Sequence, residues 1–301
     1  MHLHSHHHLH LHASTTGKIL VVFLLNAIIT FTEFIGGLLS NSLALFSDAV
    51  HNFQDTLAMG ISYGARILSK KPANTRYTFG YHRTEILSAF INMSLLIVIA
   101  FFLVREAIQR FQQPEMPKLQ IMLPVALIGL AGNALSIFIL NKDKDESLNI
   151  RSAFLHLFYD TLSSVVVLFA ALGVWLWNWT WIDPAITLVI AILMIVSSVK
   201  VLRSSIRILL NGTPEDLHPE KIVQELEEID EIINVHHVHI WNISESYRAM
   251  SCEVIINDRL LSKTESIRQK MLDVLNHHSI SHLTVQFETE CSDERIIYSI
   301  E

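Results

Sequence analysis

The residues with the clearest chemical meaning are Asp48, His51 and Asp55, which interrupt the otherwise apolar stretch LALFSDAVHNFQD. Their separations of three, four and seven positions place them on one face of a helix. A charged side chain at the centre of a lipid bilayer costs about 2.5–3.5 kcal/mol on the insertion scale. These residues therefore need a compensating partner, and that partner indicates the function.

A second pair of the same kind provides the partner. In the segment FLHLFYDTL, His156 and Asp160 stand four residues apart, as His51 and Asp55 do. If the two segments cross a bilayer in opposite directions, the pairs lie about 16 Å and about 14 Å from the ends at which their helices enter. The two depths together equal roughly the hydrocarbon thickness of 30 Å, so both pairs are expected near the middle of the membrane.

Two imidazoles and two carboxylates form a four-coordinate site that suits Zn²⁺. Zn²⁺ with two carboxylates is formally neutral, and so is the metal-free site when both histidines are protonated. The empty, deprotonated site would hold two uncompensated carboxylates in a low dielectric, which is costly. The residues therefore predict exchange of Zn²⁺ for up to two protons, since metal binding competes with histidine protonation. The alternative is two internal His–Asp ion pairs that fix helix packing.

Three further polar residues lie in apolar segments. Glu33 and Asn133 either pack helices together or line the path of the ion. Asp48 lies about two turns from Asp55, so we expect it to face an outer aqueous cavity rather than to bind the ion.

The elements that would position these residues are membrane helices. The chain has 301 residues, of which 50% are hydrophobic, and a mean hydropathy of +0.37, which is typical of a membrane protein with a polar part. Six apolar segments are long enough to cross a bilayer of about 30 Å. They are residues 19–39, 43–67, 84–111, 119–140, 150–177 and 184–202.

Charge is distributed unevenly along the chain. Residues 1–211 hold 15 Lys and Arg against 11 Asp and Glu, whereas residues 212–301 hold 7 against 18. The acidic tail would repel phosphates, which argues against nucleic-acid binding. Basic residues gather in the links after the second, fourth and sixth segments, so we expect both termini in the cytoplasm. The two cysteines, Cys252 and Cys291, are too few for a disulfide framework and suit a reducing compartment.

The tail has the pattern of a small soluble domain. An apolar helical stripe precedes two strand-like segments, 234–244 and 247–257, and a second helix and a strand at 282–288 follow. Ser262 and Glu265 have the spacing of a capping box before that second helix. The order helix–strand–strand–helix–strand predicts an α+β domain. We therefore expect a His-rich disordered cytoplasmic segment (1–17), a six-helix transmembrane domain (18–211) and a cytoplasmic α+β domain (212–301).

Four motifs, EFIGGLLSNSLALFSDAVHNFQD, RYTFGYHRTEILSA, HLFYDTLSSV and VHIW, closely resemble signatures of the cation diffusion facilitator family. They match its first two membrane helices, the link after the second helix, the fifth-helix site and the start of the cytoplasmic domain. The similarity extends from Lys18 to Glu288.

The resemblance implies export of Zn²⁺ from the cytoplasm in exchange for protons. It also implies a homodimer with a ferredoxin-like, metallochaperone-like cytoplasmic domain, and a transport site made of His51, Asp55, His156 and Asp160. The His–Asp/His–Asp form resembles the zinc-preferring branch of the family. The short chain lacks a long His-rich link between the fourth and fifth segments, which favours the inner membrane of a bacterium.

Some relatives carry a second metal site in the link between the second and third helices. The corresponding positions here are Asn74, Tyr77 and Tyr81, so we expect that metal site to be absent.

The tail contains further candidate metal ligands. The resemblance aligns His236, Glu253 and Glu288 with positions that often bind zinc at the dimer interface. Other residues of the tail are candidates by residue type: His237, His239, His277, His278, His282, Cys252 and Cys291. Two empty acidic tails would repel each other, and bound Zn²⁺ would lower that repulsion in a dimer.

Two other functions are compatible with parts of the pattern. A zinc sensor would explain the acidic tail but not the midplane pairs. An intramembrane zinc enzyme, such as a protease, would need an open coordination position and a general base, and no H-E-x-x-H motif occurs. Finally, the first twelve residues hold seven histidines, which either gather zinc near the transporter or are dispensable.

Overall fold

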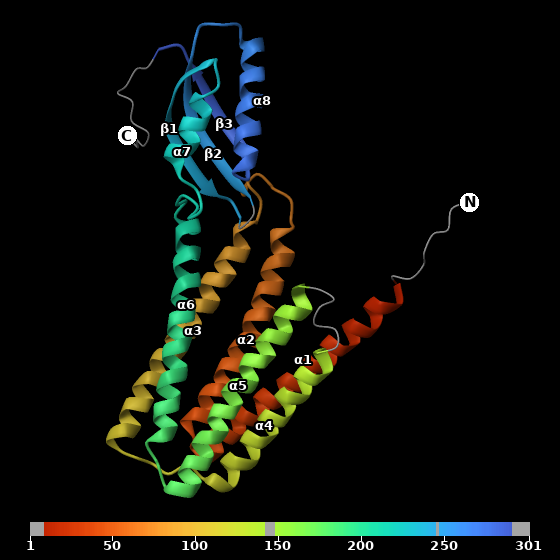
Figure 1. The fold of residues 1–301 in the computed structure, drawn as a ribbon, viewed down its shortest axis with the longest axis vertical. Coiled ribbons are helices and arrows are strands. Elements are labelled where there is room, and N and C mark those ends of the chain that lie inside the picture. Colours follow the sequence, from red (N-terminus) through yellow and green to blue (C-terminus); the bar gives the residue numbers. More distant parts are fainter. Residues whose placement is uncertain (1–8, 142–147, 245–246, 291–301) are drawn as a thin grey trace, which may run out of the picture. The chain divides into compact units, whose positions relative to one another are not determined.

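The computed structural model describes residues 9–141, 148–244 and 247–290. In these residues, six long helices precede a small α+β domain (Figure 1). The helices are α1 (Leu9–Ser40), α2 (Leu43–Ser69), α3 (Arg83–Gln112), α4 (Leu119–Leu140), α5 (Leu148–Trp177) and α6 (Ile182–Leu209). Helix α1 begins at Leu9, whereas we expected the membrane domain to begin at residue 18. Residues 1–8 of the His-rich segment lie outside the described residues.

Within the described residues, five helices are both long and apolar enough to cross a membrane, and α2 is not among them. Helix α2 has 27 residues, which is about 40 Å and ample for a span. Its hydropathy is lowered by a polar face that carries Asp48, His51 and Asp55. A helix of this kind is tolerated in a bilayer when its polar face is turned toward other helices.

The contacts divide the chain into two compact units. One contains residues 1–60 and 94–199, and the other contains residues 61–93 and 200–301. One end of each of α2, α3 and α6 therefore groups with the soluble domain. This grouping differs from the boundary near residue 211 that composition suggested.

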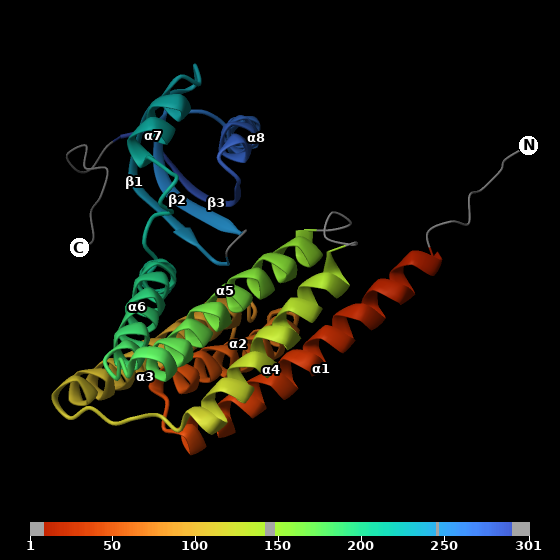
Figure 2. The ribbon, with the colours of Figure 1, turned by 60° about the horizontal axis from the view of Figure 1, so that its bottom comes forward.

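In the first unit, α1, α4 and α5 lie side by side (Figure 2). Small residues allow this close approach: a Cβ atom at Gly132 of α4 would lie 2.3 Å from Cδ1 of Ile29 in α1. A cluster of buried apolar residues joins α2 with α4 and α5 through Leu45, Met122 and Val167. The helix that carries the first His–Asp pair is thereby packed against the helix that carries the second.

The second unit contains the soluble domain in the predicted order. Its elements are α7 (Pro219–Glu227), β1 (Ile232–Asn242), β2 (Arg248–Ile256), α8 (Leu261–His277) and β3 (Ile280–Glu288). The sheet order is β1-β2-β3, with β1 and β2 antiparallel and β2 and β3 parallel. Helix α8 makes the crossover that a parallel pair requires.

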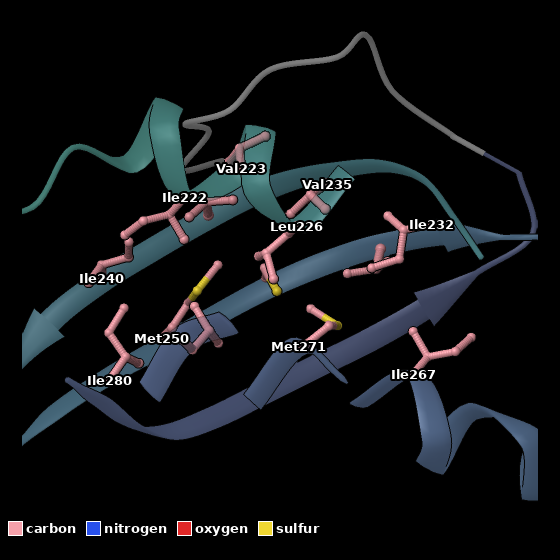
Figure 3. Packing of buried hydrophobic residues seen from close by; sticks show 14 of the residues in the cluster. Ile222, Val223, Leu226, Ile232, Val235, Ile240, Met250, Ile267, Met271 and Ile280 are labelled. Carbon is pink, nitrogen blue, oxygen red and sulfur yellow. The ribbon is translucent and has the colours of Figure 1, made fainter. Parts of the chain in front are cut away.

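The core of the soluble domain follows from the alternation of side chains along β2. Met250, Cys252 and Val254 join one buried cluster with Leu226 of α7 and Met271 of α8 (Figure 3). The intervening residues of β2 point to the opposite face of the sheet. That opposite face carries the polar side chains that are candidates for metal binding.

Candidate metal centres

Helices α2 and α5 each present one His–Asp pair to the same place. In α2, Nε2 of His51 lies 3.7 Å from Oδ2 of Asp55. In α5, Nε2 of His156 lies 3.6 Å from Oδ2 of Asp160. Between the helices, Nε2 of His156 lies 3.6 Å from Oδ2 of Asp55. The structure therefore brings together the four residues that spacing and depth singled out.

The separations are close to those of atoms that share one small cation. Ligand atoms of His51, Asp55 and Asp160 all lie within 4.8 Å of one another. Nitrogen and oxygen ligands about 2.0 Å from a tetrahedral Zn²⁺ are about 3.3 Å apart. The N–O distances of 3.6–3.7 Å need only a small contraction to reach that geometry.

Two buried polar atoms of the site lack a hydrogen-bond partner in the described part of the chain. Asp160 is 3% exposed. Among the described residues, neither Oδ2 of Asp160 nor Nδ1 of His51 has a hydrogen-bond partner. A buried polar atom without a partner costs free energy. The imidazole side chains of His51 and His156 are less buried, at 32% and 42% exposed.

Asp48 is not one of the four site residues, but it links the two helices that carry them. It is 1% exposed and accepts hydrogen bonds from the hydroxyls of Ser163 and Ser164 on α5. The expectation that Asp48 faces an outer aqueous cavity is therefore wrong. Ser164 also accepts a hydrogen bond of 3.0 Å from Nδ2 of Asn133 on α4. These contacts give Asn133 a packing role between α4 and α5.

Glu33 is a second buried carboxyl group near the site. It is 1% exposed, and Nδ2 of Asn52 donates a hydrogen bond of 3.3 Å to its Oε2 atom. A Cβ atom at Gly129 would lie 1.9 Å from Oε1 of Glu33, so the glycine leaves room for the carboxyl group. Glu33 of α1 therefore contacts both α2 and α4. Its partner in α2, Asn52, directly follows His51 in the sequence.

Asp183 of α6, which the sequence did not single out, anchors the first turn of α2. Its carboxylate accepts hydrogen bonds from the hydroxyl of Ser42 at 2.6 Å and from the backbone N–H groups of Leu43 and Ala44 at 2.8 and 3.3 Å. Asp183 is 1% exposed. It satisfies N–H groups that a helix start leaves unpaired and complements the helix dipole.

A second cluster lies on the polar face of the soluble sheet. Nε2 of His236 lies 3.4 Å from Oε2 of Glu253 and 3.7 Å from Oε2 of Glu288. Nδ1 of His237 lies 3.0 Å from Oε2 of Glu253. A β-bulge follows His236, and His237 has φ of +48°, which lets two consecutive histidines reach one carboxylate. Motif matching selected His236, Glu253 and Glu288, whereas His237 was a candidate by residue type alone.

Two other candidate ligands of the tail, Cys252 and His282, do not join this cluster. Cys252 packs in the hydrophobic core, where burial raises the pKa of its thiol to about 12. His282 pairs in register with Ala249, whereas Glu253 pairs with Gln286, so His282 lies about 13 Å further along the sheet. The prediction that Cys252 and His282 could bind a metal together with His236 is therefore wrong. Cys291 lies outside the described residues.

In the link between α2 and α3, three residues lie close together: Asn74, Tyr77 and Tyr81, which occupy the positions of the second metal site of some relatives. Nδ2 of Asn74 donates a hydrogen bond of 2.9 Å to the hydroxyl of Tyr81, and the rings of Tyr77 and Tyr81 are 4.8 Å apart. Oδ1 of Asn74 accepts hydrogen bonds from the backbone N–H groups of Arg76 and Tyr77. Here amide and phenol groups stabilise the turn.

Comparison with known sequences adds independent information. The family described as the cation efflux transmembrane domain matches residues 19–210, and the cation efflux protein cytoplasmic domain matches residues 214–290. The chain is 39% identical over 275 residues to a cadmium, cobalt and zinc/H(+)-K(+) antiporter of Bacillus subtilis, which covers 90% of this chain and 88% of that protein. It is 36% identical over 284 residues to the zinc transporter ZitB of Pectobacterium atrosepticum, with 92% and 87% covered. It is also 36% identical over 277 residues to ZitB of Escherichia coli, with 90% and 87% covered.

Proposed function

This chain belongs to the cation efflux family of membrane transporters, and from that premise we propose that it exports Zn²⁺ from the cytoplasm in exchange for protons. The transported ion binds to His51, Asp55, His156 and Asp160. Because the family is one of cation efflux proteins and its relatives are named as transporters, the chain is not an enzyme, and the alternative of an intramembrane zinc protease is rejected.

The observation that carries the proposal is the convergence of two His–Asp pairs from different helices. Nε2 of His156 is as close to Oδ2 of Asp55 as it is to Oδ2 of Asp160. Two isolated ion pairs that only fixed packing would not need to share atoms across the helices. A cation site requires ligand atoms from different helices to converge on one point, and Oδ2 of Asp160, which is buried and accepts no hydrogen bond from the described residues, is available as such a ligand.

Charge balance supports protons as the exchanged ion. With two carboxylates in the site, Zn²⁺ gives a formally neutral complex, and two protonated histidines give the same total without metal. Histidine is the side chain whose charge changes most readily near neutral pH, and it must lose its proton to bind a metal. A relative is named as exchanging metal for H⁺ and K⁺, so potassium is the competing counter-ion.

Imidazole and carboxylate ligands support zinc as the main substrate. Nitrogen and oxygen donors in a four-coordinate set suit Zn²⁺, whereas Mg²⁺ and Ca²⁺ prefer oxygen donors in larger sets. Relatives are named for zinc and also for cadmium and cobalt. The two histidines are the reason to place zinc first here.

The assembly and location follow from the same family membership. We propose a homodimer in the inner membrane of a bacterium, with both termini in the cytoplasm. The cluster of His236, His237 and Glu253 would then hold a regulatory Zn²⁺. This cluster favours zinc sensing as a second activity of the same chain, because bound Zn²⁺ offsets the negative charge of two adjacent tails.

Purified protein in lipid vesicles that contain a zinc dye and a pH dye tests the proposal. We expect zinc entry to be accompanied by proton exit, to accelerate with an imposed outward proton gradient and to be indifferent to a potassium gradient. Asp160→Asn should abolish zinc entry, and the exposed Glu265→Gln should leave it unchanged. Zinc flux that ignores the proton gradient would contradict antiport, and full activity in Asp160→Asn would contradict the site.

A further inference from the structure

A cavity of about 480 Å³ lies in the second unit, where the link between α2 and α3 meets the soluble sheet. Lys70, Lys71 and His82 of the link and His282 of β3 contribute to its walls. None of these residues belongs to the proposed transport site or to the cluster around Glu253. The cavity therefore needs an explanation of its own.

The cavity is rich in hydrogen-bond donors and has no acidic lining. Among the described residues that line it, none is Asp or Glu. Between Ser69 and Thr84 the chain contains four Lys and Arg residues and no acid. The nearest acid along the chain, Glu85, accepts a hydrogen bond from the hydroxyl of Ser69. The two lysines at the cavity thus face a concave surface with no negative charge.

Contacts between aromatic rings connect the two sides of the cavity, the α2–α3 link and the soluble domain. The ring of His282 lies 6.0 Å from Phe79 in an edge-on contact and 6.4 Å from Tyr247. Tyr247 also lies 6.3 Å from the ring of His82. The link turns at Gly80, whose φ of +74° strongly favours glycine. These contacts shape the cavity before any ligand enters.

We propose that this cavity binds a phosphate-bearing anion, either the headgroup of an anionic phospholipid or free phosphate. Lysine ammonium groups and imidazole N–H groups are donors to phosphate oxygens. The membrane helices α2 and α3 end and begin at this link, which places it where lipid headgroups lie. Phe79, which is 52% exposed, offers an apolar surface for an acyl chain beside the charged groups.

Calorimetry on the detergent-solubilised full chain tests the proposal with three probes. Dioctanoyl phosphatidylglycerol carries the anionic headgroup, dioctanoyl phosphatidylcholine carries a phosphate without net charge, and inorganic phosphate carries no acyl chains. The variant is the double substitution Lys70→Gln, Lys71→Gln. The matched control is Lys221→Gln, Lys263→Gln, which removes the same charge from exposed helix positions of the soluble domain.

We expect phosphatidylglycerol to bind at least about tenfold more tightly than phosphatidylcholine, because the two lysine ammonium groups attract the net negative charge of the anionic headgroup. The Lys70, Lys71 variant should lose this preference and the control should keep it. If inorganic phosphate displaces the lipid, the natural anion can be free phosphate, and if it does not, the lipid is the source. Equal binding of both lipids, or an unchanged preference in the Lys70, Lys71 variant, would overturn the proposal.

Discussion

Oδ2 of Asp55 lies between two histidines, 3.7 Å from Nε2 of His51 in its own helix and 3.6 Å from Nε2 of His156 in α5. The first pair depends only on the pitch of α2, whereas the second depends on how α2 and α5 pack. A relative shift of the two helices therefore dismantles the site without unfolding either helix. A transporter needs a site of this kind, because it must bind an ion and then release it.

Removal of the Asp183 carboxylate should loosen α2. Asp183→Ala leaves the hydroxyl of Ser42 and two backbone N–H groups without their buried acceptor. We expect a loss of at least about 3 kcal/mol in the free energy of unfolding, measured by denaturant titration in detergent, because three buried groups lose their acceptor and each unsatisfied buried group costs about 1–3 kcal/mol.

The matched control for this substitution is Asp216→Ala. Asp216 also accepts a hydrogen bond, from Arg248, but its side chain is 63% exposed. Its removal should cost less than about 1 kcal/mol. Equal losses for the two variants would refute the anchoring role of Asp183.

A methyl group at position 129 should disturb the site from a distance. In Gly129→Ala the new Cβ atom would lie 1.9 Å from Oε1 of Glu33, which must then move away from Asn52. We expect a destabilisation of about 1–3 kcal/mol, typical of overpacking, and slower zinc transport in vesicles. Gly64→Ala has no atom within 4 Å of its new Cβ and should be neutral or stabilising by up to about 1 kcal/mol. Normal stability and transport in Gly129→Ala would contradict the packing described for Glu33.

The cluster of His236, His237 and Glu253 should account for one bound zinc per chain, separate from the proposed transport site. In a chain without the His-rich residues 2–12, we expect two tightly bound Zn²⁺ by equilibrium dialysis. Glu253→Gln should reduce this number to one, because Glu253 contacts both His236 and His237. Glu265→Gln, whose carboxylate bonds only to exposed Arg268, should keep two. Two ions retained in Glu253→Gln would show that the cluster does not bind zinc.

The thiol of Cys252 should be unreactive in the folded protein. Burial raises its pKa to about 12 from the usual 9.0, so the reactive thiolate is scarce below that pH. In a Cys291→Ser variant, iodoacetamide at pH 8 should modify the chain only after denaturation, as read by mass spectrometry. Rapid modification of the folded protein would mean that Cys252 is accessible and would restore it as a possible metal ligand.

The sequence contains enough information to predict the convergence of the two His–Asp pairs. A spacing of four residues fixes each pair on one helix face. The depths of about 16 Å and about 14 Å, counted from opposite faces of the membrane, sum to roughly the hydrocarbon thickness and therefore place both pairs at one level. The alternation of Met250, Cys252 and Val254 with polar neighbours also marks Cys252 as a core residue. Its chemical type favoured a ligand role that its position in the strand excludes.

Other features depend on contacts that leave no local pattern. The bond between Asp183 and Ser42 joins residues 141 positions apart, and a single acid near a helix start does not reveal its acceptor role. The bulge that turns His237 toward Glu253 is a property of strand pairing. The capping box expected from Ser262 and Glu265 is not formed: α8 begins at Leu261 after an N-cap at Leu260, and Glu265 bonds to Arg268 instead.

We propose that Zn²⁺ and protons compete for one site between α2 and α5. Calorimetric titration of zinc near pH 7, in buffers of different ionisation enthalpy, counts the protons released per ion bound. The chain should lack residues 2–12 and carry Glu253→Gln, so that only the transport site is titrated. We predict release of between one and two protons per Zn²⁺ and loss of binding in Asp160→Asn. Zinc binding without proton release, or binding that survives Asp160→Asn, would show that Zn²⁺ and protons do not compete for this site.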